Sequence, residues 1–205
     1  MAIQDDVLIV DDDTQIAALT SPARLEVVDA VRVIGPCSIA DIGQFLGRAP
    51  DSLYYHVRKL LKVGLLIECG TRKTRRRDEA VYRTPARRIR TPLDPHDPAR
   101  SAQVARVFAA LLRLTDRDFK AAAKRGGITS LGPKRNARHG RVKAWLSEGD
   151  LTEVHGYLDR ILDVFERERP KADAAARKLY SITAFLTPME PKRRRGGETT
   201  NHDDA

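Results

Sequence analysis

Residues 52–65 read SLYYHVRKLLKVGL, the most informative run in the chain. Leu53, Val57 and Leu60 recur at helical spacing, which predicts a helix with one apolar, core-facing side. Asp51 or Ser52 is placed to cap its start. The other side carries hydroxyl groups and cations that suit the edges and phosphates of a DNA groove. These candidate contact residues are Ser52, Tyr54, Tyr55, Arg58, Lys59 and Lys62.

Two more helices are expected just before this one. The first occupies residues 21–35, from a Ser-Pro start to a Gly-Pro stop. The second occupies residues 38–47, where Ser38 and Asp41 form a near capping box and glycine ends the helix. The turn Arg-Ala-Pro then leads directly into the helix that contains residues 52–62. Short helices joined by so tight a turn predict a helix-turn-helix hairpin.

A basic hairpin is expected after the third helix. Residues 65–67 and 80–84 favour strands, and the polar segment 70–78 connects them as a long charged tip, which is the pattern of a wing. A solvated loop is the simpler interpretation of such a charge run, but its dense positive charge favours contact with an anion. The candidate phosphate or minor-groove contacts are Arg72, Lys73, Arg75, Arg76 and Arg77.

The positive charge of the chain is unevenly distributed. The formal net charge is +9, and residues 1–47 contribute 2 Lys/Arg against 8 Asp/Glu, whereas residues 48–90 contribute 13 against 4. A local basic excess of this kind indicates a polyanionic partner. Double-stranded DNA is therefore the expected partner of the N-terminal half.

The runs LTSPARLEVVDAV, SIADIGQFLG and APDSLYYHVRKLLKVGLL, followed by the basic hairpin, resemble the ArsR-type winged helix-turn-helix regulators of bacteria. The resemblance covers roughly residues 15–90 and implies a winged-helix fold that binds DNA. Metal-sensing members carry a Cys-x-Cys pair in the region that matches residues 40–44, and this chain has none. The resemblance therefore implies no thiolate metal site, and we expect no metal and no cofactor.

The C-terminal half is expected to form a second, helical or α+β region that supports dimerisation. A proline-rich linker at residues 91–98 separates a DNA-binding domain, residues 1–90, from this region, residues 99–187. Strands are expected at residues 141–146 and 179–186, and a disordered basic tail at residues 188–205. Two apolar helix faces need a partner, and we expect a second copy to supply it. The candidate dimerisation residues are Val104, Val107, Phe108 and Leu111 in one helix, and Leu151, Val154, Leu158, Ile161 and Phe165 in a helix that starts after Ser147.

The complete pattern predicts a mainly α (α+β) protein with a small β-hairpin. Its expected function is that of a dimeric, sequence-specific transcriptional regulator, and a repressor is favoured over an activator. No catalytic motif is present, so we expect no enzymatic activity. An acidic N-terminus and the lack of a long apolar run favour the cytoplasm over a membrane. Three alternatives stay open: a nonspecific, architectural nucleic-acid-binding protein, an enzyme or interaction module in the C-terminal half, and an unidentified small-molecule effector.

Overall fold

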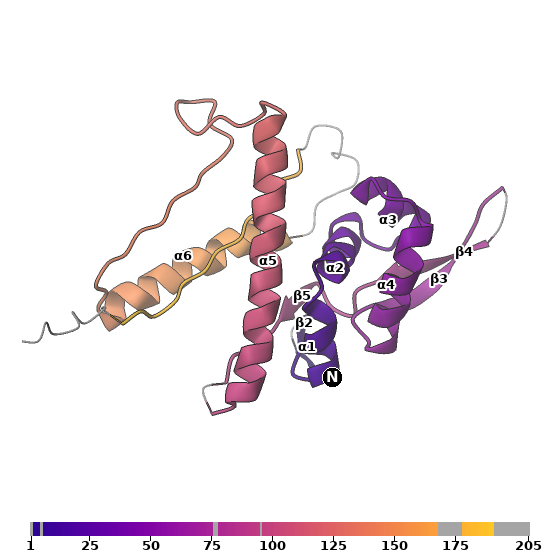
Figure 1. Ribbon diagram of the computed structural model, residues 1–205, viewed down its shortest axis with the longest axis horizontal. Coiled ribbons are helices and arrows are strands. Elements are labelled where there is room, and N and C mark those ends of the chain that lie inside the picture. Colours follow the sequence, from indigo (N-terminus) through magenta and orange to yellow (C-terminus); the bar gives the residue numbers. More distant parts are fainter. Residues whose placement is uncertain (1, 5, 76–77, 95, 168–177, 191–205) are drawn as a thin grey trace, which may run out of the picture.

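Three helices and a β-hairpin form a winged helix in the N-terminal half of the computed structural model, which describes residues 2–4, 6–75, 78–94, 96–167 and 178–190. Helices α2 (Pro22–Ile34), α3 (Ile39–Leu46) and α4 (Asp51–Lys62) are followed by the wing strands β3 (Ile67–Lys73) and β4 (Asp78–Arg83). The order and the mainly helical composition confirm the predicted winged helix-turn-helix layout. Figure 1 shows the wing extending away from the three helices.

Local signals in the sequence account for the ends of these helices. The Ser38 side chain accepts from Asp41 N–H, and the Asp41 carboxylate accepts from Ser38 N–H, which confirms the capping box. Gly47 ends α3 with φ at 64°, a left-handed conformation that glycine adopts without strain. Helix α4 differs from the prediction in its cap, because the N-cap is Pro50 and Asp51 already lies in the first helical turn.

The turn between α3 and α4 is tight because glycine at position 43 lets the backbone approach. A Cβ atom built on Gly43 would lie 2.7 Å from the backbone oxygen of Arg48. A side chain there would push the start of α4 away from α3. Gly43 therefore sets the geometry of the helix-turn-helix hairpin, a role that the sequence pattern did not reveal.

The apolar face of α4 lies at the centre of the core. Leu53, Val57 and Leu60 are at most 1% exposed and pack with residues of α2 and α3. Complete burial of each such side chain stabilises a fold by about 1.5–3 kcal/mol. The helical periodicity of residues 52–62 thus correctly predicted which face is buried.

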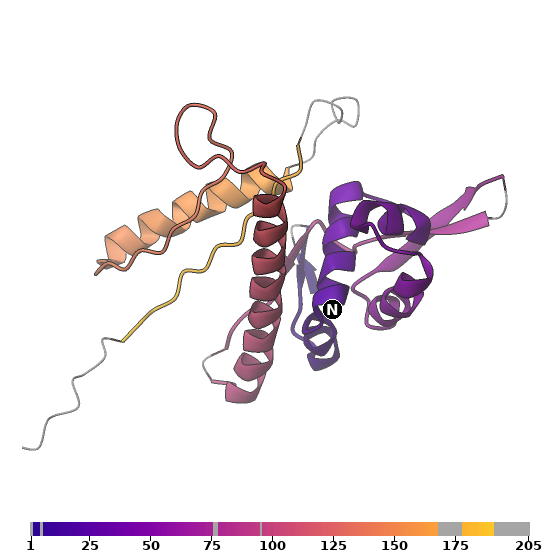
Figure 2. The same ribbon diagram turned by 45° about the horizontal axis from the view of Figure 1, so that its top comes forward.

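Helix α5 (Pro98–Lys124) completes this same core. Val104, Val107, Ala110 and Leu114 are buried in one cluster with α2 and α4, and α5 packs along α1 (Asp13–Leu19) and α2. Figures 1 and 2 both show most of α6 (Glu148–Glu166) on the opposite side of α5 from the winged helix. The expected boundary at residues 91–98 does not separate two cores, because α5 shares the core of the winged helix.

Two small sheets flank the helices. In the first, β2 (Val7–Ile9) pairs antiparallel with β1 (Ala2–Gln4) and parallel with β5 (Arg88–Arg90). In the second, β3 and β4 form the wing, with an irregularity between Glu68 and Gly70. The wing strands extend through most of the segment predicted as loop, and only the residues between positions 73 and 78 connect them.

The C-terminal half departs further from expectation. Residues 141–146 and 179–186, both predicted as strands, have no regular structure. A strand needs a neighbour to accept its backbone hydrogen bonds, and within the described ranges neither segment has one. Helix α6 begins as predicted, with a capping box between Ser147 and Asp150. Of the expected basic tail, residues 191–205 lie outside the described residues.

Candidate nucleic-acid interface

The exposed side of α4 carries the predicted contact residues. Ser52, Tyr55, Arg58, Lys59 and Lys62 are all exposed, whereas Tyr54 is only partly so. The Lys59 ammonium lies 5.6 Å from the centre of the Tyr55 ring, which is within the range of a cation–π contact. The sequence therefore placed these side chains on the correct face, and their contact with DNA stays a prediction.

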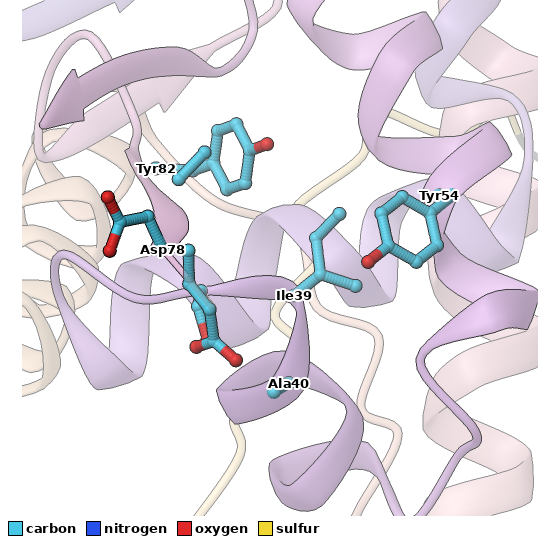
Figure 3. Close-up of a pocket in the computed structure, with 8 residues that line it drawn as sticks. Ile39, Ala40, Tyr54, Asp78 and Tyr82 are labelled. Carbon is cyan, nitrogen blue, oxygen red and sulfur yellow. The ribbon is translucent and has the colours of Figure 1, made fainter. Parts of the chain in front are cut away.

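Tyr54 faces a hollow between α4 and the wing. The hollow measures about 210 Å³. In Figure 3, Ile39 lies between Tyr54 of α4 and Tyr82 of β4. The eight residues that line the hollow come from α3 and its N-cap, α4 and β4: Ser38, Ile39, Ala40, Tyr54, Asp78, Glu79, Ala80 and Tyr82. Since the wing side contributes two carboxylates, the hollow itself is not a cationic phosphate site.

The wing carries exposed cations toward its tip. Lys73 ends β3 and Arg75 follows it, and both side chains are exposed. Arg76 and Arg77, two of the predicted contacts, lie outside the described residues. The ends of β3 and β4 that lie nearest the tip project beyond the helices in both ribbon views, so the exposed cation Lys73 is displaced from the body of the protein.

Arg72, also predicted as a DNA contact, is engaged within the chain. One nitrogen of its guanidinium donates to Ser38 Oγ at 3.0 Å, to Asp41 Oδ1 at 3.0 Å and to the Glu79 carboxylate at 3.1 Å. Hydrogen bonds to Asp41 and Glu79 raise the pKa of Arg72. Burial favours the neutral form of Asp41, but hydrogen bonds from Arg72 and Ser38 outweigh it and lower the pKa of Asp41. Arg72 therefore joins the wing to the start of α3.

A backbone bridge reinforces this junction at the base of the wing. Cys37 N–H donates to the Tyr82 carbonyl at 3.0 Å, and Tyr82 N–H donates to the Cys37 carbonyl at 2.9 Å. Burial raises the pKa of the Cys37 thiol to about 11, so this thiol stays protonated at neutral pH. The α2–α3 connection and the wing are thus held as one unit.

Sequence reasoning missed a cluster of arginines around Glu166, at the end of α6. Its carboxylate is paired with Arg88 at 2.8 Å, Arg90 at 3.3 Å and Arg32 at 3.4 Å. Arg87 also donates to its backbone oxygen. The Glu166 side chain is only 10% exposed. These partners lie far apart in sequence, and no local pattern signals the cluster.

Ion pairs within the chain neutralise part of the basic excess in residues 48–90. Arg88 and Arg90 are neutralised by α6, and Arg72 by Asp41 and Glu79. Six cations in the described part of α4 and the wing make no ion pair with another described residue: Arg58, Lys59, Lys62, Lys73, Arg75 and Arg83. The unneutralised positive charge of this segment is therefore concentrated on the outer face of the third helix and on the wing.

A tight helical hairpin, a third helix with a cationic outer face and a basic wing define a winged helix-turn-helix protein. Residues 19–69 match the family model of helix-turn-helix domains, which is the domain of DNA-binding transcription regulators. No curated protein matches the chain. Among the described residues, no helix is long and apolar enough to cross a membrane. In the same residues no three His, Cys, Asp or Glu side chains are grouped as metal ligands.

Proposed function

We propose that this chain is a sequence-specific, double-stranded DNA-binding transcriptional regulator of the ArsR type that represses transcription as a homodimer in the cytoplasm. It acts by binding and not by catalysis. The observation that carries the proposal is the placement of unneutralised cations on α4 and the wing, which together border one side of the winged helix.

Each element has a physical role in this proposal. Helix α4 enters the major groove, where the Arg58 guanidinium reads a guanine through two hydrogen bonds, while Ser52, Tyr55 and Lys59 approach bases or phosphates. The wing cations neutralise phosphates beside or in the minor groove. In the homodimer each copy binds one half-site of the operator, and the two half-sites lie about one turn of the DNA helix apart.

The test is selection of bound fragments from genomic DNA, followed by competition between the recovered operator and random DNA. A regulator should favour its operator by a factor of about 10³ or more at physiological salt. If all fragments bind alike, the protein is a nonspecific or architectural DNA-binding protein. That second candidate draws its support from the same unpaired cations, which attract any duplex.

A further inference from the structure

A long irregular segment connects α5 to α6, and its charge is entirely positive. Residues 125–146, here the basic arm, contain six Lys/Arg and no Asp/Glu. Its first part is folded: the Asn136 side chain accepts from Thr129 N–H at 2.7 Å and donates to the Gly127 carbonyl at 2.7 Å. Figure 1 shows the arm as a separate excursion from the end of α5 to the start of α6.

The second part of the basic arm exposes large apolar side chains. Residues 138–146 are all exposed and have no regular secondary structure, with Val142 at 89% and Trp145 at 87% exposed, and Figure 1 shows this part of the chain drawn out toward the start of α6. A scattered exposed residue needs no explanation, but an extended run that exposes both an aromatic and an aliphatic side chain gains free energy when a partner covers it. None of the arm cations makes an ion pair within the described ranges.

Helix α6 offers the complementary surface. Within the described part of the chain no α6 side chain is buried, although Leu151, Val154, Leu158, Ile161 and Phe165 form one apolar stripe. The helix contains six Asp/Glu and one Arg, for a net charge of −5. The four acids nearest its start, Glu148, Asp150, Glu153 and Asp159, make no ion pair with a described Lys or Arg.

We propose that the basic arm of one copy lies across the α6 stripe of a second copy, and reciprocally; this inference rests on the homodimer in the proposed function. Val142 and Trp145 cover the apolar stripe, and the arm cations face the acids beside it. The dimensions agree, since nine extended residues span about 30 Å and a 19-residue helix about 28 Å.

The exposure of the arm favours pairing between copies over pairing within one chain. The basic arm runs directly into Ser147, whose backbone is extended with ψ at 169° and is held by the capping box with Asp150. In Figures 1 and 2 the arm runs outward from the end of α5 to the start of α6, and the chain then turns back toward α5 along the helix. Val142 and Trp145 nevertheless stay exposed, so the arm does not cover the apolar stripe of its own helix, and both surfaces are left for a second copy.

The first experiment uses Trp145, which is the sole tryptophan of the chain. Covering it in a dimer shifts its emission to shorter wavelength and reduces its quenching by acrylamide. We expect both changes as the full-length protein is concentrated through the dissociation constant measured by sedimentation. A dimer whose Trp145 remains as accessible as in the monomer overturns the arm contact, and a chain that stays monomeric overturns it as well.

The second experiment tests whether the contact is made between copies. We expect Trp145→Glu and Leu158→Glu each to weaken the dimer at least tenfold, whereas Ser130→Glu, which adds the same charge to the folded part of the arm, leaves the dimer unchanged. Each damaged chain retains the surface that the other lacks. A mixture should therefore form a heterodimer tighter than either variant's homodimer, measured by native mass spectrometry.

Two results would overturn the inference at this stage. If the mixture shows no such restoration, the arm does not pair with α6 of the other copy. If Trp145→Glu weakens DNA binding while the dimer constant is unchanged, the arm is a DNA contact. Neither measurement of dimerisation contains DNA, so a failure here is distinct from a failure to recognise an operator. Circular dichroism checks that each variant retains the helical content of the wild type.

Discussion

Replacing Arg72 with alanine should weaken operator binding without removing a phosphate contact. The Arg72 guanidinium already donates to Ser38, Asp41 and Glu79 at 3.0–3.1 Å. Without it, the wing loses its side-chain link to α3 and two carboxylates lose a cationic partner beside the DNA. We therefore expect lower affinity for the operator, because the wing is less well positioned relative to α4.

The dependence of affinity on salt separates positioning from direct contact. Removing a cation that neutralises one phosphate reduces the slope of log affinity against log salt by about 0.9. Lys73→Ala provides the matched control, since Lys73 is the exposed neighbour of Arg72 and makes no ion pair with a described residue. We expect this reduction for Lys73→Ala and a slope close to that of the wild type for Arg72→Ala, both measured by fluorescence anisotropy over a salt series.

A double-mutant cycle gives an independent check on the same residue. Arg72→Ala and Asp41→Ala should destabilise the fold less together than the sum of the single variants in urea unfolding, because they remove one shared interaction. Additive losses, or a slope reduction for Arg72→Ala as large as that for Lys73→Ala, would refute the positioning role and restore Arg72 to the DNA interface.

Three further outcomes are expected. Replacing the three arginines at positions 75–77 with alanine should weaken binding to all DNA and flatten the salt slope by about one unit for each phosphate that they neutralise; an unchanged slope removes the wing tip from the interface. Arg58→Ala should cost about 1–3 kcal/mol on the operator and little on random DNA, whereas Lys59→Ala should weaken both alike, and equal losses for Arg58→Ala would contradict base reading. Burial, and then nearby arginines, lower the pKa of His56 below its usual 6.5, so the folded state favours the neutral ring and stability falls as the pH drops below about 6.5. Thermal unfolding between about pH 7.5 and pH 5.5 should show this fall in the wild type, and a smaller fall in His56→Gln.

Local signals predicted the winged helix well because each depends on neighbours in sequence. The spacing of Leu53, Val57 and Leu60 identified a buried helix face, and the Ser38–Asp41 capping box marked a helix start. Both features are complete within a few residues. The exposed face of α4 could be predicted from the same pattern, because its residues are those that do not belong to the buried face.

The contacts that join distant segments could not be predicted in this way. Periodicity showed that Val104 and Val107 need a partner, but not that α1 and α2 of the same chain supply it. The composition of the wing showed that Arg72 is cationic, but not that α3 places two acceptors beside it. Residues 141–146 have suitable side chains for a strand, yet a strand also depends on a neighbour that composition does not reveal.

The attachment of α6 at Glu166 makes this helix a lever with one fixed end. Arginines from α2 and β5 hold its last turn against the winged helix, while within the described structure no α6 side chain is buried. A rotation of about 20° at the fixed end moves the start of this 19-residue helix by about 10 Å. A small change in the angle at the arginine cluster therefore produces a large displacement at the far end of α6. Conversely, a force applied at that far end is transmitted to β5 and α2 through the arginine cluster.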